Sequence, residues 1–542
     1  MEKPHITGDH LQKYSAAPTQ SIDQIHRSRG SQAPEVEPGE RKKRLIGLFG
    51  GLLAAALTYV IMPEEVPDAA RLTAATAVLM GAWWMTEALP IPATALLPLV
   101  IFPVFNAEVE INDIGASYGN NIIFLFMGGF LLALAMQRWN LHRRIALLTL
   151  TIMGTKPSMM VAGFMVATGF LSMWVSNTAT AVMMIPIGVS VLMLIAQASG
   201  TTAIQIGDAA TPDSEEVKQA VIKSDFGTAL MLGIAYAASI GSLGTLIGTP
   251  PNTLLAGYMA DTHGVHIGFG QWMLVGVPLS AVVLFFCWFL LTKVLFKPEI
   301  DEIPGGKKLI ANEYAKLGAM SAGEVRVLII FIAAALAWIF VPIIWPESTP
   351  ITDAGIAVAV GLLLFALPAG GTANKGVRLI DWETATKLPW GVLLLFGGGL
   401  ALSGQFTSSG LTKWIGDSVE QMGVMPVLVI VLLVTAGVIF LTELTSNTAT
   451  AATFLPVAGG IAIGMGYDPM LLAIPVALAA TCAFMLPVAT PPNAIAYGSG
   501  YVTIGQMVKG GLWLNLFCIV VITAVTMTLA VWIFGLHPGL NP

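Results

Sequence analysis

Long apolar stretches alternate with short polar loops along the chain, from about residue 44 to its end. A helix needs about 20 apolar residues to cross the hydrocarbon core of a bilayer. Stretches of this kind lie at about 44–62, 70–88, 90–105, 120–137, 225–260, 271–296, 327–346, 351–369, 388–404, 469–500 and 511–536. The pattern therefore predicts an all-α integral membrane protein with eleven transmembrane helices.

Two further apolar stretches, at about 157–197 and 426–466, are too long for one straight span each. The tripeptide Ser-Asn-Thr interrupts both of them near the middle, at 176–178 and at 446–448. Polar backbone at membrane depth is tolerated where it lines a cavity. We therefore expect two re-entrant hairpins, one opening inward and one opening outward, with their tips near the midplane.

Basic residues decide how the spans are oriented. The cluster at 41–44 precedes the first span and predicts a cytoplasmic N-terminus. If neither hairpin crosses the membrane, only Arg71 and Lys413 of the 26 Lys and Arg residues fall outside. We therefore expect a multi-pass protein of a bacterial inner membrane, with its C-terminus external.

Several residues recur at a constant offset of 270 positions, including Phe126 with Phe396 and Pro186 with Pro456. After one extra span, each half contains five spans and one hairpin that does not cross the membrane. Because the number of spans per half is odd, the second half is inverted relative to the first. The chain is thus expected to contain two inverted-topology repeats. The expected parts are a disordered cytoplasmic tail (1–43), an extra first helix (44–66), a first repeat (67–297), a cytoplasmic linker (298–326) and a second repeat (327–542).

Composition excludes a soluble protein, because 55% of the residues are hydrophobic and only 11% are charged. The three cysteines lack metal-ligand spacing, and no HExxH or Ser/His/Asp pattern lies in the spans. A membrane-embedded enzyme and an organic cofactor are therefore disfavoured. A passive channel fits less well than alternating access, because broken hairpins in inverted repeats are typical of secondary transporters.

A second motif follows each tripeptide: Thr-Pro-Pro-Asn, at 249–252 and at 490–493. No Lys or Arg lies centrally in any predicted span, so an anionic substrate would be held by hydroxyls, helix N-termini or bound cations. Exposed carbonyls beside an Asn oxygen suit Na⁺, and two copies predict two cation sites around one anion site. Alternatively, the hydroxyls bond only to their own helices. Glu443 either orients the second hairpin tip, senses the cation or caps a helix end.

These paired motifs resemble those of the divalent anion:sodium symporter family of di- and tricarboxylate transporters, over about residues 44–542. The resemblance implies a homodimer of scaffold and transport domains in membrane lipid, with an elevator-type mechanism. By motif match, the substrate would contact Ser176, Asn177, Thr178, Thr249, Ser446, Asn447, Thr448, Thr490 and Pro491. The resemblance also implies that one Na⁺ would be bound by Ser172, Ser176, Asn177 and Gly248, and the other by Thr442, Thr445, Asn447 and Ala489.

The implied function is Na⁺-coupled uptake of C4-dicarboxylates such as succinate, malate and fumarate. Both tripeptides end in Thr, whereas some members of the family have Val at the end of the second, and this favours a dicarboxylate over citrate. The motifs leave open a Na⁺-independent dicarboxylate exchanger and a symporter for citrate or sulfate. No nucleic acid is expected as a partner.

Overall fold

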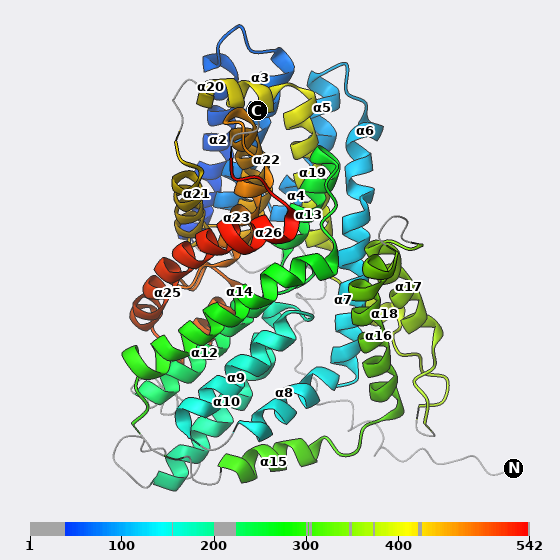
Figure 1. Ribbon diagram of the computed structural model, residues 1–542, viewed down its shortest axis with the longest axis vertical. Helices are drawn as coiled ribbons and strands as arrows, with labels where there is room; N and C mark the ends of the chain where they lie inside the picture. The colour runs from blue at the N-terminus through cyan, green and yellow to red at the C-terminus, as the bar shows by residue number, and fades with distance from the viewer. Residues whose placement is uncertain are drawn as a thin grey trace, which may run out of the picture.

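The computed structural model describes residues 38–153, 156–199, 224–299, 302, 306–345, 350–371, 374–420 and 425–539. Regular structure in these ranges is helical (Figure 1), apart from an isolated β-bridge between Pro368 and Arg378. The helices of the first half are α2 (Pro38–Ile61), α3 (Asp68–Thr86), α4 (Ile91–Thr94), α5 (Pro98–Phe105), α6 (Ile111–Ala116), α7 (Asn121–Arg138), α8 (Leu141–Ile152), α9 (Pro157–Ser172), α10 (Asn177–Ser199), α12 (Asp225–Ser242), α13 (Pro250–His263) and α14 (Phe269–Phe289).

The linker and the second half contain a comparable series. Its helices are α15 (Gly306–Lys316), α16 (Ala322–Ile344), α17 (Asp353–Ala366), α18 (Trp382–Ala385), α19 (Trp390–Ser408), α20 (Leu411–Glu420), α21 (Val427–Thr442), α22 (Asn447–Gly464), α23 (Met470–Thr481), α24 (Pro491–Gly498), α25 (Ile504–Val525) and α26 (Val531–Phe534). The expectation of an all-α membrane protein is confirmed.

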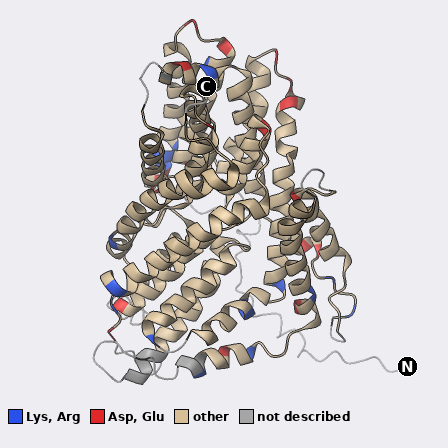
Figure 2. Ribbon diagram, viewed as in Figure 1, with Lys and Arg blue, Asp and Glu red and all other residues tan. Residues whose placement is uncertain are grey.

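Six helical segments in the described part of the chain are long and apolar enough to cross a membrane. Several of the other expected spans contain shorter helices, among them α17 and α23, and each expected hairpin contains two helices, α9 with α10 and α21 with α22. Figure 2 shows charged residues mainly near the ends of the helices, while most of the ribbon of α9, α12 and α14 is free of them. The count of eleven spans and the inverted repeats stay predictions.

Glycines allow the closest helix contacts. The Cα of Gly128 in α7 lies so near α17 that an added Cβ would be 2.4 Å from the Ala357 carbonyl oxygen. Gly398 in α19 would likewise bring a Cβ within 2.2 Å of the Ala95 carbonyl oxygen. These matching glycines therefore serve close helix packing.

Each half has a short amphipathic helix between a long helix and its hairpin, namely α8 before α9 and α20 before α21. Both follow a residue in the left-handed conformation, Asn140 (φ 56°) before α8 and Gly410 (φ 80°) before α20. Neither helix is predicted above. Their signal is the periodicity of apolar residues, which a search for continuous apolar stretches overlooks.

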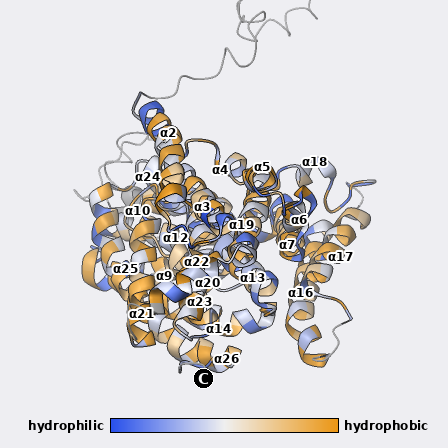
Figure 3. Ribbon diagram, turned by 90° about the horizontal axis from the view of Figure 1, so that it is seen from above, coloured by the Kyte–Doolittle hydropathy of each residue, from blue (hydrophilic) through white to orange (hydrophobic). Residues whose placement is uncertain are grey.

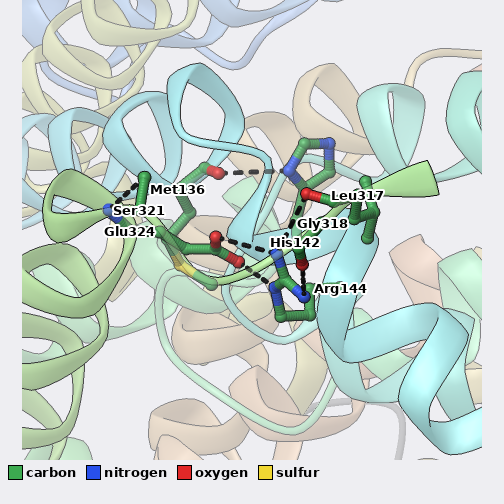
Figure 4. A network of polar contacts seen from close by, with 7 residues as sticks. All are labelled: Met136, His142, Arg144, Leu317, Gly318, Ser321 and Glu324. Atoms are coloured by element: carbon green, nitrogen blue, oxygen red, sulfur yellow. Dashed lines mark hydrogen bonds and ion pairs between the residues drawn. The ribbon is translucent and has the colours of Figure 1, made fainter. Parts of the chain in front are cut away.

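Helix α8 is fixed to the linker between the halves by a buried ion pair (Figure 4). The Arg144 guanidinium binds the Glu324 carboxylate with two nitrogens, and its Nη1 donates to the Gly318 carbonyl at 3.1 Å. The neighbouring His142 donates from Nδ1 to the Met136 carbonyl at 3.1 Å. Burial lowers the pKa of His142 below 6.5, so the ring is neutral at pH 7.

Helix α2 lies at the edge of the molecule, with hydrophilic residues at one end (Figure 3). It begins at Pro38, before residue 44 where we expected the first span, so the predicted tail 1–43 includes its first turn. Residues 1–37, which make up most of the expected tail, and residues 200–223 lie outside the described residues. The expected linker 298–326 contains α15, which we did not predict.

Candidate functional site

The two tripeptides lie at breaks between helices. Helix α9 ends at Ser172 and α10 begins at Asn177, while α21 ends at Thr442 and α22 begins at Asn447. The Ser446 backbone has the extended conformation of an N-cap (φ −67°, ψ 131°), yet its hydroxyl makes no capping bond. The start of α22 therefore keeps unsatisfied N–H groups and a hydroxyl that are able to bind an anion.

The Thr-Pro-Pro-Asn motifs begin α13 and α24, after non-helical stretches at 243–249 and 482–490. Each motif Asn bonds back across its own stretch. Asn252 Nδ2 donates to the Leu243 and Thr245 carbonyls at 3.2 and 2.9 Å. Asn493 Nδ2 makes the matching pair of bonds, at 3.3 and 3.2 Å, to the carbonyls of residues 483 and 486. These two amides therefore hold the unwound backbone in shape on both sides of the site.

The first candidate cation cluster lies behind the tip of the first hairpin. Ser172 Oγ donates to the Ala238 carbonyl at 2.5 Å and lies 3.3 Å from Asn177 Oδ1. Asn177 Nδ2 donates to Ser242 Oγ at 3.3 Å. Hydroxyl, carbonyl and amide oxygens thus gather where the first hairpin meets α12.

The second cluster has the same composition. Thr442 Oγ1 donates to the Ala480 carbonyl at 2.9 Å. One terminal atom of the Asn447 amide lies 3.1 Å from each of three oxygens, which are Thr442 Oγ1 and the carbonyls of Ala480 and Ala489. With nitrogen in that place, the amide donates to these oxygens. With oxygen in that place, the Asn447 oxygen and these three oxygens lie close together. A small hard cation binds such a set of oxygen ligands. The residues therefore fit Na⁺.

A single cavity of about 710 Å³ connects the two clusters. All nine residues expected to contact the substrate line it, as do Gly248, Thr445 and Ala489 of the expected Na⁺ ligands. Ser172 and Thr442 contact the two Asn amides from behind. The Thr445 hydroxyl instead bonds to the Leu441 carbonyl at 3.1 Å and to Thr450 Oγ1 at 2.6 Å. The structure thus brings the predicted residues together, and their ligand roles stay predictions.

Glu443 is the acidic residue whose role the sequence left open. Its buried carboxylate accepts bonds from the backbone N–H groups of residues 484, 485 and 486 at 2.7, 2.9 and 3.0 Å. It also accepts from Asn515 Nδ2 at 2.6 Å. Of the alternatives, the contacts favour positioning, because the carboxylate ties the second hairpin to the unwound stretch before α24.

Charged residues also line the cavity, and the sequence analysis did not anticipate them there. They are Glu40, Lys43 and Arg44 from the first turns of α2, and Glu87 after α3. In the sequence, the basic cluster indicates only the orientation of the chain. The clue that they reach the cavity is the spacing of Gly47 and Gly51, which permits α2 to pack closely against a neighbouring helix.

The model of the family described as "Sodium:sulfate symporter transmembrane region" matches residues 43–536. The chain belongs to the sodium:sulfate symporter family. A member of this family is a multi-pass integral membrane transporter, so the expectation of a transporter and not an enzyme is confirmed. The expected resemblance to anion:sodium symporters is confirmed as well.

Two curated proteins are similar to this chain along most of their length. The chain is 44% identical over 498 residues to the "Sodium-dependent dicarboxylate transporter SdcS" of Staphylococcus saprophyticus, covering 91% of this chain and 92% of that protein. It is 43% identical over 487 residues to the protein of the same name from Staphylococcus aureus, covering 89% and 90%.

Two solved structures share the fold at low sequence identity. The Alcanivorax borkumensis YdaH transporter superposes with a TM-score of 0.52 at 13% identity, covering 84% of this chain and 98% of that one. Neisseria gonorrhoeae MtrF superposes with a TM-score of 0.50 at 14% identity, covering 91% and 99%. These likenesses support the helical transporter fold and nothing further about the substrate.

Proposed function

We propose that this protein is a secondary active transporter that couples Na⁺ to the uptake of C4-dicarboxylates such as succinate, malate and fumarate. One observation carries the proposal: the matching motifs of both halves line one cavity, and each sets an Asn amide among hydroxyl and carbonyl oxygens. The curated relatives named as sodium-dependent dicarboxylate transporters support the same substrate and coupling ion.

The dianion would lie between the two hairpin tips. Each tip offers Ser, Asn and Thr from its tripeptide, and the N-termini of α10, α13, α22 and α24 border the same cavity. Helix N-termini carry partial positive charge and free N–H groups, so they attract carboxylates. Thr249, Thr490 and Pro491 complete the proposed contacts. Two tips with matching donors suit a substrate with a carboxylate at each end.

The two Na⁺ ions travel with the substrate. One would be held by Ser172, Ser176, Asn177 and Gly248, and the other by Thr442, Thr445, Asn447 and Ala489. No Lys or Arg lies among these residues, so the cations themselves would neutralise the dianion. Substrate and Na⁺ then raise each other's affinity by the same factor, as binding linkage requires.

Alternating access would proceed as an elevator, in which the hairpins and the unwound helices move as a transport domain against a scaffold within a homodimer. The basic start of α2 orients the protein with its N-terminus in the cytoplasm and its C-terminus outside, in a bacterial inner membrane. With that orientation, a cavity that reaches the basic end of α2 would open to the cytoplasm, which supports an inward-facing conformation.

The deciding experiment measures radiolabelled succinate uptake by the purified protein in proteoliposomes, with Na⁺ replaced by choline or K⁺. We expect uptake only with Na⁺, and we expect unlabelled malate and fumarate to compete better than citrate or sulfate. Uptake that is indifferent to the cation would contradict Na⁺ coupling and favour exchange. Competition dominated by sulfate would overturn the dicarboxylate assignment.

A further inference from the structure

One end of the cavity is built by a helix that lies outside both expected repeats. Glu40, Lys43 and Arg44 of α2 line the cavity together with the motif residues, beside Thr86 and Glu87 at the end of α3. The helix that is expected to have no counterpart in the second half therefore borders this end of the cavity.

Close packing fixes which residues of α2 face the mouth. A Cβ added to Gly47 would lie 2.0 Å from Thr86 Oγ1, and one added to Gly51 would lie 2.7 Å from Trp83 Cδ1. Trp83 Nε1 also donates to the Leu48 carbonyl at 3.2 Å. Lys43 is one helical turn before Gly47 and two turns before Gly51, so it projects from the same face of α2 toward the end of α3.

Two basic and two acidic residues line this mouth. Among the described residues that line the cavity, Lys43 and Arg44 are the only Lys and Arg. Arg44 lies 3.6 Å from Glu40, and its side chain remains 42% exposed. Glu87 is the other acid there, while Arg41 and Lys42 add two more positive charges to the same helix end. The charges that line the mouth therefore balance, and the surplus of positive charge at this helix end comes from Arg41 and Lys42, which lie outside the cavity lining.

We propose that Lys43 and Arg44 form a cytosolic docking site for the transported dicarboxylate, outside the central site. This inference rests on the proposed function. A dianion that leaves the central site is no longer stabilised by the two Na⁺ ions. Lys43 and Arg44 are then the only full positive charges among the described residues of the cavity wall. Charges at the rim of a cleft raise the local concentration and the capture rate of an oppositely charged ligand.

The consequence is a difference between the two faces of the membrane. Cytosolic dicarboxylate is captured at lower concentration than the central site alone would allow, so accumulated substrate slows further net uptake. Lys43 and Arg44 line only this end of the cavity, so we expect the external half-saturation not to depend on them.

The test compares two double-substitution variants of the full-length protein. Each is assayed in right-side-out and in everted membrane vesicles. We expect Lys43→Gln with Arg44→Gln to raise the half-saturation for cytosolic succinate roughly three- to ten-fold at low ionic strength. The external value should stay the same. Arg41→Gln with Lys42→Gln is the matched control, because it removes equal charge from the same turn at positions that do not line the cavity. Lys43→Arg with Arg44→Lys should behave like the unsubstituted protein.

The inference is overturned if both neutralised pairs change the cytosolic half-saturation equally, if neither does, or if the change appears on both faces. High salt should shrink the difference between the pairs, because it screens exposed charges. A failure of the proposed function is distinguishable, since the unsubstituted protein would then show no Na⁺-dependent succinate transport at all.

Discussion

The two hairpins have the same tripeptide, yet each is tied to its unwound partner stretch in a different way. In the second hairpin, the Glu443 carboxylate accepts three backbone N–H bonds and one amide bond. The position 270 residues earlier is Met173, whose carbonyl accepts a single bond from Thr245 Oγ1 at 2.5 Å. One half thus uses a buried negative charge where the other uses a neutral carbonyl.

This difference indicates that the two cation clusters are unequal although their ligand types match. A carboxylate one residue after Thr442 adds attraction for a cation in a poorly solvated place. Its bonds also order the stretch that carries Ala489. We therefore expect the second cluster to bind Na⁺ more tightly than the first.

The most decisive test asks whether the halves are inverted at all. A cysteine at Gly410 should be labelled by an impermeant thiol reagent only from outside, and one at Gly306 only from inside. Background labelling should be small, because the native Cys287, Cys482 and Cys518 are buried. Labelling of both positions from the same side would contradict the inverted arrangement.

The next largest effect is expected at the paired Asn residues. Asn177→Ala and Asn447→Ala should each reduce Na⁺-dependent uptake roughly ten-fold or more, because losing one polar partner in a desolvated site costs about 1–3 kcal/mol. Ser190→Ala is a suitable control, since that hydroxyl bonds only to the Pro186 carbonyl of its own helix. Normal Na⁺ dependence in both Asn variants would refute the cation assignment.

The two amphipathic helices should differ strongly in what their basic residues contribute to stability. Arg144→Ala leaves the buried Glu324 carboxylate without its ion pair, which is expected to cost about 3–5 kcal/mol. Lys413→Ala in α20 should change stability by less than about 0.5 kcal/mol, because that side chain is exposed. Thermal unfolding of the purified variants measures both. Equal melting temperatures would show that α8 does not depend on this ion pair.

A smaller effect is expected from Glu443→Gln. The amide has one acceptor oxygen in place of two, and its NH₂ group would face backbone N–H donors, so stability should fall by about 1–3 kcal/mol. The Na⁺ half-saturation for transport should rise as well. Met173→Leu at the matching position should leave both quantities nearly unchanged. Similar behaviour of the two variants would mean that the clusters are equivalent after all.

The sequence predicted the features that depend on local pattern. Both helix breaks fall at the Ser-Asn-Thr tripeptides, and all nine predicted substrate contacts line one cavity. Features that depend on distant partners were missed. The donors to Glu443 include Asn515, 72 residues away, and α2 brings Lys43 to the cavity only because α3 packs on its glycines. No local pattern specifies such pairings.

The glycine contact of α2 has a consequence for the lipid surroundings. The helix is about 36 Å long, against a hydrocarbon core of about 30 Å. Its outer face is apolar and exposed, because Ile46, Phe49 and Val60 are each at least 61% exposed. A thinner bilayer favours greater tilt of such a helix, which would move Lys43 and Arg44 relative to the mouth. Acyl-chain length should therefore alter cytosolic succinate capture by a small factor, while an unchanged value across vesicles of different chain length would show that α3 holds α2 rigidly.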